Sequence, residues 1–368
     1  KDKKKLIIFS FFFFSLIISY ILGENSTGGA ENDYLATKKF LDIFTLDLVE
    51  GFNLFIDQGQ VHFPFFYILI ANANKLLGKI FVDCAYITIS SFIPLVFYEI
   101  LKKKFLNADP EKLFILSLVI FLSPNFRSSA VWVTTDNLAL FFFILSVYNF
   151  VIFENLKGNY LKYIYFTFFF LILASYIRHY YAIFFIFYFL YLQNKINYIK
   201  NFKILLFNLI LSIPALIYVY FWITKKEFQA FDILSIDFVY NFLVFTSLYL
   251  FYFLPFILNK KFFSKFVNEI KYRKIILILI LSLFILLFII YETPYMEFGG
   301  GIFYKISQLT NSKFFIIFSL LGLLSLIFFN NISFRNYLIF SIFIFAFPFE
   351  IIFQKYFDPL IIVVCLSL

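Results

Sequence analysis

The sequence predicts an all-α, polytopic integral membrane protein with about twelve transmembrane helices. Of its 368 residues, 62% are hydrophobic and 14% are charged, whereas a soluble domain is about 45–50% apolar and about 25% charged. A globule of this size cannot bury that excess, so much of its apolar surface is expected to face lipid. Only helices and closed barrels satisfy the backbone there. The apolar runs are continuous rather than alternating, as in 275–290 and 314–329, which favours helices over a barrel.

The first expected span is the apolar run 6–22, which follows the basic segment Lys1–Lys5. Such a start also resembles a secretory signal peptide. However, no small-x-small cleavage site ends the run and many spans follow, which favours a retained helix. By the positive-inside rule, the segment Lys1–Lys5 predicts a cytoplasmic N-terminus.

Basic clusters recur along the chain, and the same rule predicts that all of them are cytoplasmic. Between successive clusters the chain must cross out and return, and paired apolar runs fit this scheme. The clusters are Lys102–Lys104 with Lys112, Lys157 with Lys162, Lys195 with Lys200 and Lys203, the group from Lys260 to Lys274, and Arg335. The runs are 113–123 with 137–153, 163–177 with 180–193, 204–224 with 238–258, 275–291 with 314–329, then 337–348 and a last one from Pro359. We therefore expect one transmembrane domain over 1–368 in the plasma or inner membrane, with the last span cut short.

The first outer loop, 23–79, is long and acidic, and a long loop in a compact protein is more often functional than idle. Of the two apolar runs between the first span and Lys102–Lys104, only 80–101 is expected to cross, because two crossings would put that cluster outside. The run 63–77 should then form an interfacial helix at the outer face, which suits the Asn and Lys side chains within it.

Polar side chains gather at the outer ends of the expected spans, where each needs a reason because polar groups near lipid are costly. The set comprises Glu31, Asp33, His62, Arg127, Asp136, Arg178, His179, Lys355 and Tyr356. Two or more carboxylates, histidines and several cations on one face favour a site for a charged lipid or phosphate. A divalent metal such as Mg or Mn, held by Asp33 and Asp136, is a further option.

Each of these residues also has a purely structural interpretation. Asp136 at the start of a helix can cap its free amides and suits the helix dipole. Arg178 and Lys355 can be interface anchors whose charged ends reach water. Glu31 and Asp33 can be solvated loop charges. The ordered series, rather than any single member, points to a site.

Five short motifs in this series resemble, in order, motifs of the GT-C superfamily of membrane glycosyltransferases. The resemblance is closest to the protein mannosyltransferase and aminoarabinose transferase branch. The motifs are Glu31-Asn-Asp-Tyr34, His62-Phe-Pro-Phe-Phe-Tyr67, Ala130-Val-Trp-Val-Thr-Thr-Asp136, Ala174-Ser-Tyr-Ile-Arg178 and Lys355-Tyr-Phe-Asp-Pro359. The first lacks the usual Asp-Glu pair, the second has one proline replaced, and the last has Lys in place of Arg.

The resemblance implies an inverting glycosyltransferase that moves a hexosyl or pentosyl group from a polyprenyl-phosphate carrier to a glycan, lipid or protein acceptor at the outer face. Asp33 or Glu31 would be the general base, and Asp136 would orient the acceptor, the base or a metal. Arg178 and Lys355 would neutralise the phosphate leaving group. The further substrate-binding residues would be His62, Arg127, His179 and Tyr356.

Other classes stay open beside this interpretation. A polymerase or ligase of surface polysaccharide also uses polyprenyl carriers, but it typically has its main loop late in the chain. A lipid-linked sugar flippase or another transporter would show matched halves and charges at mid-membrane, whereas here the ionisable residues lie at span ends. No nucleotide cofactor or nucleic-acid partner is expected, because a nucleotide-binding fingerprint is missing and the basic residues fall between spans.

Overall fold

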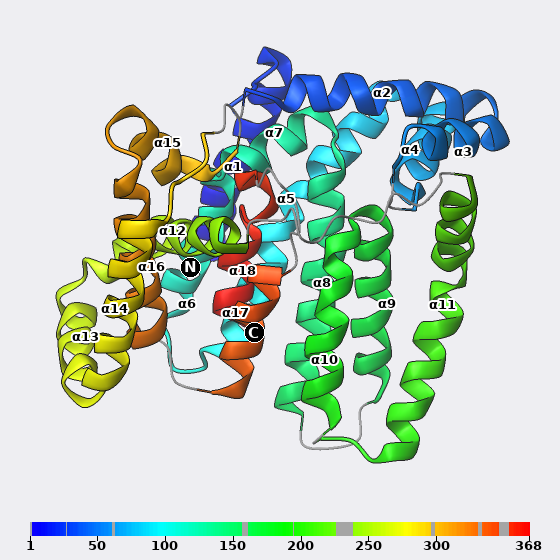
Figure 1. Cartoon of the computed structure of the whole chain (residues 1–368). Helices are drawn as coiled ribbons and strands as arrows, with labels where there is room; N and C mark the ends of the chain where they lie inside the picture. Colours follow the sequence, from blue (N-terminus) through cyan, green and yellow to red (C-terminus); the bar gives the residue numbers. More distant parts are fainter. Residues whose placement is uncertain are drawn as a thin grey trace. The chain divides into compact units, whose positions relative to one another are not determined.

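The computed structural model describes residues 2–26, 28–60, 63–156, 161–193, 195–225, 238–295, 299–329, 333–345 and 353–368. Within these ranges the regular structure is entirely helical, which confirms the all-α class (Figure 1). Five helices are long and apolar enough to cross a membrane, or up to seven if two bent pairs are each one span. The shorter apolar helices have 10–17 residues, and a crossing needs about 20. The expected total of twelve spans therefore stays a prediction.

The contacts group the chain into two compact units, Lys1–Ala230 with Val363–Leu368, and Phe231–Ile362. The helices of the first unit are α1 (Asp2–Leu22), α2 (Ala30–Leu46), α3 (Leu48–Asp57), α4 (Phe65–Leu77), α5 (Lys79–Lys104), α6 (Pro110–Ser117), η1 (Leu118–Leu122), α7 (Pro124–Trp132), α8 (Thr135–Asn155), α9 (Leu161–Ile177), η2 (His179–Ile183), α10 (Phe184–Gln193) and α11 (Tyr198–Lys225). Those of the second are α12 (Phe238–Ile257), α13 (Lys260–Tyr272), α14 (Lys274–Ile290), α15 (Gly301–Leu309), α16 (Lys313–Phe329), α17 (Phe334–Phe345) and η4 (Gln354–Tyr356), while α18 (Leu360–Ser367) crosses the boundary.

Aromatic packing around α8 forms much of the core of the first unit. The helix is apolar on every side, a pattern typical of a helix surrounded by neighbours. Phe143 and Phe150 are buried, and their rings lie 4.7 and 4.8 Å, between centroids, from Phe184 and Tyr188 on α10. α8 also packs along α5 and α9. These contacts fix where α8 and α9 end relative to one another. They therefore also fix the positions of the side chains at those helix ends.

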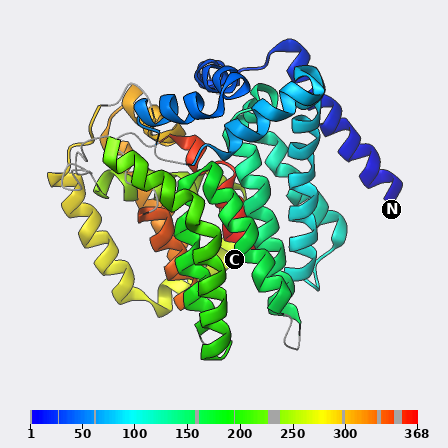
Figure 2. The same cartoon turned by 90° about the vertical axis from the view of Figure 1, so that its right-hand side faces the viewer.

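The long first loop folds into α2, α3 and α4, which lie together at one end of the first unit (Figure 1; Figure 2). α4 confirms the helix predicted at 63–77, whereas α2 and α3 had no distinct signal in the sequence. Phe40 on α2 packs against Phe55 on α3 and Tyr67 on α4, with ring centroids 4.8 and 5.3 Å apart. With 13 residues, α4 rises about 20 Å, which is short of a hydrocarbon core of about 30 Å.

The other end of the first unit collects basic residues from separate parts of the sequence. Lys5 Nζ donates a 2.7 Å hydrogen bond to Tyr98 Oη, and Lys102 Nζ lies 4.8 Å from the centroid of the same ring. Lys104 is 3.9 Å from the Glu154 carboxylate at the end of α8. Tyr191, near the end of α10, donates a hydrogen bond to the same Glu154 carboxylate, and Lys195 Nζ lies over the Tyr191 ring. These clusters thus share one end, as the charge pattern predicts, and the side of the membrane on which they lie stays a prediction.

A close approach of two backbones joins α12 and α16 in the second unit. A Cβ placed on Gly322 would lie 1.9 Å from the carbonyl oxygen of Thr246, so no larger residue fits without a shift of the helices. Nearby, Ser319 Oγ donates a 2.8 Å hydrogen bond to the Leu243 carbonyl. Small and hydroxyl residues at a helix contact are typical of helix pairs in membranes.

Candidate functional site

An ion pair between Asp136 and Arg178 joins two of the predicted site residues. Arg178 Nη2 lies 2.9 Å from Asp136 Oδ1, and the two side chains are 21% and 20% exposed. Asp136 is in the first turn of α8, and Arg178 is the N-cap residue of η2, directly after α9 ends at Ile177. Because α8 and α9 pack along one another, their adjoining ends bring residues of two separate sequence motifs into contact.

Buried tyrosines from three elements lie within electrostatic range of this ion pair. Tyr67 on α4, Tyr86 on α5 and Tyr181 in η2 are 6%, 2% and 2% exposed, and the charges of Asp136 and Arg178 act on all three hydroxyls. Tyr86 Oη also fixes the start of α8, since it accepts a hydrogen bond from the backbone N–H of the fourth α8 residue at 3.2 Å. Charges in such surroundings interact more strongly than they would in bulk water.

The turn between α7 and α8 presents Asp136, and its side chains explain the composition of the motif at 130–136. Ser129 Oγ accepts a hydrogen bond from Thr134 Oγ1 at 2.8 Å and one from the Asn137 backbone N–H at 3.1 Å. Between Ser129 and Thr134, Val133 adopts a left-handed conformation with φ of 49°. This conformation is rare for a β-branched residue and costs about 1–2 kcal/mol. Strain of this kind persists only where the surrounding structure requires it.

One of the two carboxylates in the first turn of α2 is linked to the ion pair. Tyr67 is hydrogen-bonded to Thr37 on α2, and the charge of Asp33 acts on Tyr67 together with those of Asp136 and Arg178. Thr37 Oγ1 in turn donates to the Asp33 carbonyl at 2.8 Å. Glu31 lies in the same turn, and both carboxylates are exposed. Both Asp33 and Glu31 stay predicted candidates for the loop carboxylate of this site.

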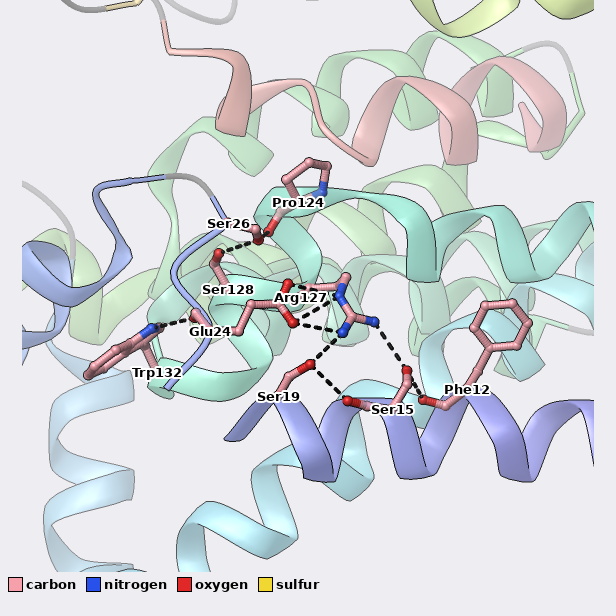
Figure 3. A network of polar contacts seen from close by, with 9 residues as sticks. All are labelled: Phe12, Ser15, Ser19, Glu24, Ser26, Pro124, Arg127, Ser128 and Trp132. Atoms are coloured by element: carbon pink, nitrogen blue, oxygen red, sulfur yellow. Dashed lines mark hydrogen bonds and ion pairs between the residues drawn. The ribbon is translucent and has the colours of Figure 1, made fainter. Parts of the chain in front are cut away.

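Arg127, expected to bind substrate, is held by partners within the protein (Figure 3). Its Nε contacts the two Glu24 carboxylate oxygens at 3.0 and 3.2 Å, and Nη2 donates to Glu24 Oε2 at 2.7 Å. Nη1 donates to Ser15 Oγ at 3.1 Å, and Nη2 also contacts Ser19 Oγ. The hydrogen bonds from Arg127 hold the pKa of Glu24 at about 2, although burial acts in the opposite direction. This network ties the start of α7 to the end of α1.

The remaining predicted residues are placed as follows. His179 is exposed in η2 beside Arg178. His62 lies outside the described residues. Lys355 and Tyr356 belong to η4 in the second unit, where Gln354 Nε2 donates to Tyr252 Oη at 3.0 Å. The predicted approach of Lys355 to the Asp136–Arg178 pair, which belongs to the other unit, stays a prediction.

A metal site is not assembled by the described part of the chain. Among those residues, no group of three or more His, Cys, Asp and Glu side chains is arranged to hold an ion. Asp33 and Asp136 as metal ligands therefore stay a sequence-based expectation, and the chemistry below is derived without one.

A second polar group, Lys79 with Asp83, was not among the expected site residues. Its signal in the sequence is a Lys and an Asp at i and i+4 at the start of an otherwise apolar run, since an ionisable residue inside such a run is costly.

No protein-family model, curated protein or solved structure matches this chain. Its function must therefore be inferred from its own residues and their geometry.

Proposed function

We propose that the chain is a membrane glycosyltransferase of the GT-C type, which moves a sugar from a polyprenyl-phosphate carrier to an acceptor at the outer face. The observation that carries the proposal is the Asp136–Arg178 ion pair. It joins residues from two of the motifs that resemble this superfamily, it is partly exposed, and buried tyrosines lie within electrostatic range of it. A cation held in this way suits an anionic leaving group.

Arg178 is the proposed ligand of the carrier phosphate. Asp136 engages one nitrogen of the guanidinium and so fixes its orientation, while about a fifth of the side chain stays accessible. Charge-assisted hydrogen bonds from a guanidinium to phosphate oxygens are short and strong. Asp136 is then a positioning residue for Arg178, and not the base, because its own charge is already engaged.

Asp33 is the proposed general base. It is exposed in the first turn of α2 and linked to the ion pair through Tyr67. In the proposed step, its carboxylate accepts the proton of an acceptor hydroxyl or amine as the acceptor atom attacks the anomeric carbon. The bond from that carbon to the phosphate oxygen breaks, and polyprenyl phosphate leaves with the electron pair. Attack from the side opposite the phosphate inverts the configuration.

The proposed topology has twelve spans, a cytoplasmic N-terminus and the site at the outer face of the plasma or inner membrane. It is supported by the separation of charges within the first unit. Lys5, Lys102 and Lys104 lie at one end of α5, whereas the α2–α4 segment and Asp136 lie at the other. The shorter apolar helices, α9 and α16 among them, would supply the crossings beyond the longest helices.

Sugar transfer in nanodiscs tests this proposal. The purified protein would receive radiolabelled polyprenyl-phosphate sugars and a cell-envelope acceptor extract. We expect Asp33→Asn to lower kcat by about 100-fold or more, because general-base catalysis contributes at least that factor. Glu31→Gln, in the same turn, and Asp42→Asn, also exposed on α2, are matched controls that should retain activity.

Arg178→Gln separates the roles in the site, because it removes the cation but keeps a hydrogen-bond donor. It should weaken carrier binding and slow transfer together. Unchanged transfer in both Asp33→Asn and Arg178→Gln would overturn the proposed site. Carrier binding without transfer in the unmodified protein, untouched by either substitution, would favour a flippase or transporter.

A further inference from the structure

A small open pocket of about 90 Å³ lies where α1, α2, α5 and α7 meet, apart from the Asp136–Arg178 pair. Its lining residues are Tyr20, Gly23, Tyr34, Lys79, Asp83, Val131, Trp132 and Val133. A space of this size has room for a small polar group.

The polar groups of the pocket are ordered by depth. Asp83 is 3% exposed and lies at the bottom, where its Oδ2 accepts hydrogen bonds from Tyr20 Oη at 2.8 Å and from Lys79 Nζ at 2.5 Å. The Lys79 side chain is 57% exposed, and its ammonium reaches this carboxylate from the solvent side. If the flexible Lys79 side chain swings outward, the buried carboxylate and the outer ammonium are complementary to a zwitterion that enters with its cationic end first.

Aromatic rings line the pocket beside this ion pair. The ring centroids of Tyr34 and Trp132 are 5.7 Å apart, and Lys79 Nζ lies 5.6 Å from the centroid of Tyr34. Aromatic faces next to a carboxylate form the usual surroundings of a bound ammonium group. In this structure the ammonium of Lys79 itself occupies this position beside Asp83 and Tyr34. Because its side chain is long and flexible, it can move to the mouth of the pocket while another ammonium takes its place.

Exposed apolar side chains continue from the rim of the pocket along α1 and α5. Ile21 and Leu22 are 73% and 77% exposed, and Ile80 and Phe81 are 74% and 60% exposed. In a membrane-spanning chain, such surfaces face acyl chains. The pocket therefore lies at the level where lipid head groups begin.

We propose that this pocket binds the head group of a zwitterionic phospholipid that carries a primary ammonium, with the ammonium directed to Asp83 and the phosphate to Lys79. A primary ammonium donates hydrogen bonds to the carboxylate. A trimethylammonium donates none and needs more room. An anionic head group without a cation would meet the buried Asp83 carboxylate. The site is independent of the proposed transfer reaction and needs no second substrate.

Native mass spectrometry of the full chain tests this proposal. Delipidated protein in detergent would receive equal amounts of phosphatidylethanolamine, phosphatidylcholine and phosphatidylglycerol. We expect phosphatidylethanolamine to be retained about tenfold more than either of the others, a difference of about 1.4 kcal/mol. Asp83→Asn, which keeps the shape of the side chain, should abolish that preference. Asp57→Asn, whose carboxylate is 63% exposed and 3.9 Å from Lys225, is the matched control and should leave it unchanged.

Further arms keep the proposal open to refutation. Tyr34→Leu should weaken the preference for phosphatidylethanolamine even if Asp83→Asn fails to fold, because it removes one aromatic face. Soluble glycerophosphoethanolamine should displace the bound lipid, since the head group carries the recognition. If only diacyl lipids compete, whatever their head groups, the apolar rim alone binds and the proposal is wrong. Preferred retention of phosphatidylglycerol, or a preference that survives in both Asp83→Asn and Tyr34→Leu, would overturn it as well.

Discussion

Replacing Arg127 with methionine should destabilise the junction of α1 and α7 without touching the proposed catalytic pair. The substitution keeps an unbranched apolar stem and removes the donors to Glu24, Ser15 and Ser19. Glu24 then loses the hydrogen bonds that hold its pKa at about 2, compared with an ordinary value of 4.5. At about 1.4 kcal/mol for each pH unit, the full shift corresponds to about 3 kcal/mol. Solvent screening reduces it to about 1–2 kcal/mol, because the two side chains are 21% and 25% exposed.

The pH dependence has a definite sign. The pKa of Glu24 is lower in the folded protein, so its contribution to stability is fully present above pH 4.5 and is lost as the pH falls towards 2. Thermal unfolding in detergent should therefore separate the original protein from Arg127→Met at pH 7. The difference between the two proteins should shrink as the pH falls through about 2, where the Glu24 carboxylate of the original protein becomes protonated.

A double-mutant cycle with Glu24→Gln isolates the pair. We expect a coupling free energy of about 1–2 kcal/mol between the two positions, because they interact directly. Lys225→Met, which removes an exposed cation 3.9 Å from Asp57, is a control that should change stability by less than about 1 kcal/mol. Equal stability of Arg127→Met and the original protein at pH 7, with no coupling to Glu24, would refute a structural role. Loss of carrier binding in a fully stable Arg127→Met protein would return Arg127 to the substrate site.

Three further substitutions test the packing. Gly322→Ala should lower the thermal midpoint, by about 1–3 kcal/mol of stability, because its Cβ would overlap the carbonyl oxygen of Thr246; Gly29→Ala, with open space at its Cβ, should not. Val133→Gly removes a buried side chain but should cost less than Val131→Gly, at the neighbouring buried valine of α7, because glycine adopts a φ of 49° without strain; an equal cost in the same unfolding assay would refute the left-handed turn. Ser319→Ala should cost about 1 kcal/mol by removing its hydrogen bond to a backbone carbonyl of α12, and a cost of zero would mean that the bond is not formed.

Local composition is sufficient to predict the helices, because continuous apolar runs have few ways to satisfy their backbone in lipid. Each expected apolar run lies within or overlaps a helix, from α1 at Asp2–Leu22 to α16 at Lys313–Phe329. The helices α2 and α3 had no comparable signal. They are stabilised by contacts such as that of Phe40 with Phe55, between rings on different elements, which periodicity within either segment does not reveal.

The residues of the candidate site were predicted from the sequence, but most of their contacts were not. The sequence identified Asp136 and Arg178 as residues at span ends, but their 2.9 Å contact depends on where α8 and α9 end relative to each other. It placed Asp33 and Glu31 on equal terms, and the structure shows both in the first turn of α2, which packs on α4. Arg127 illustrates the converse, because a cation expected to bind substrate meets Glu24 within the protein.

By itself the sequence determined the class of this protein: a chain of apolar helices, with basic residues gathered at one end of those in the first unit. Those properties depend on composition and on the order of charges along the chain, so they need no knowledge of distant contacts. The tertiary structure decided which polar groups became partners, as in Asp136 with Arg178 and Asp83 with Tyr20. An ion pair or hydrogen bond forms over about 3 Å, and only the packing of helices from distant parts of the chain brings side chains that close.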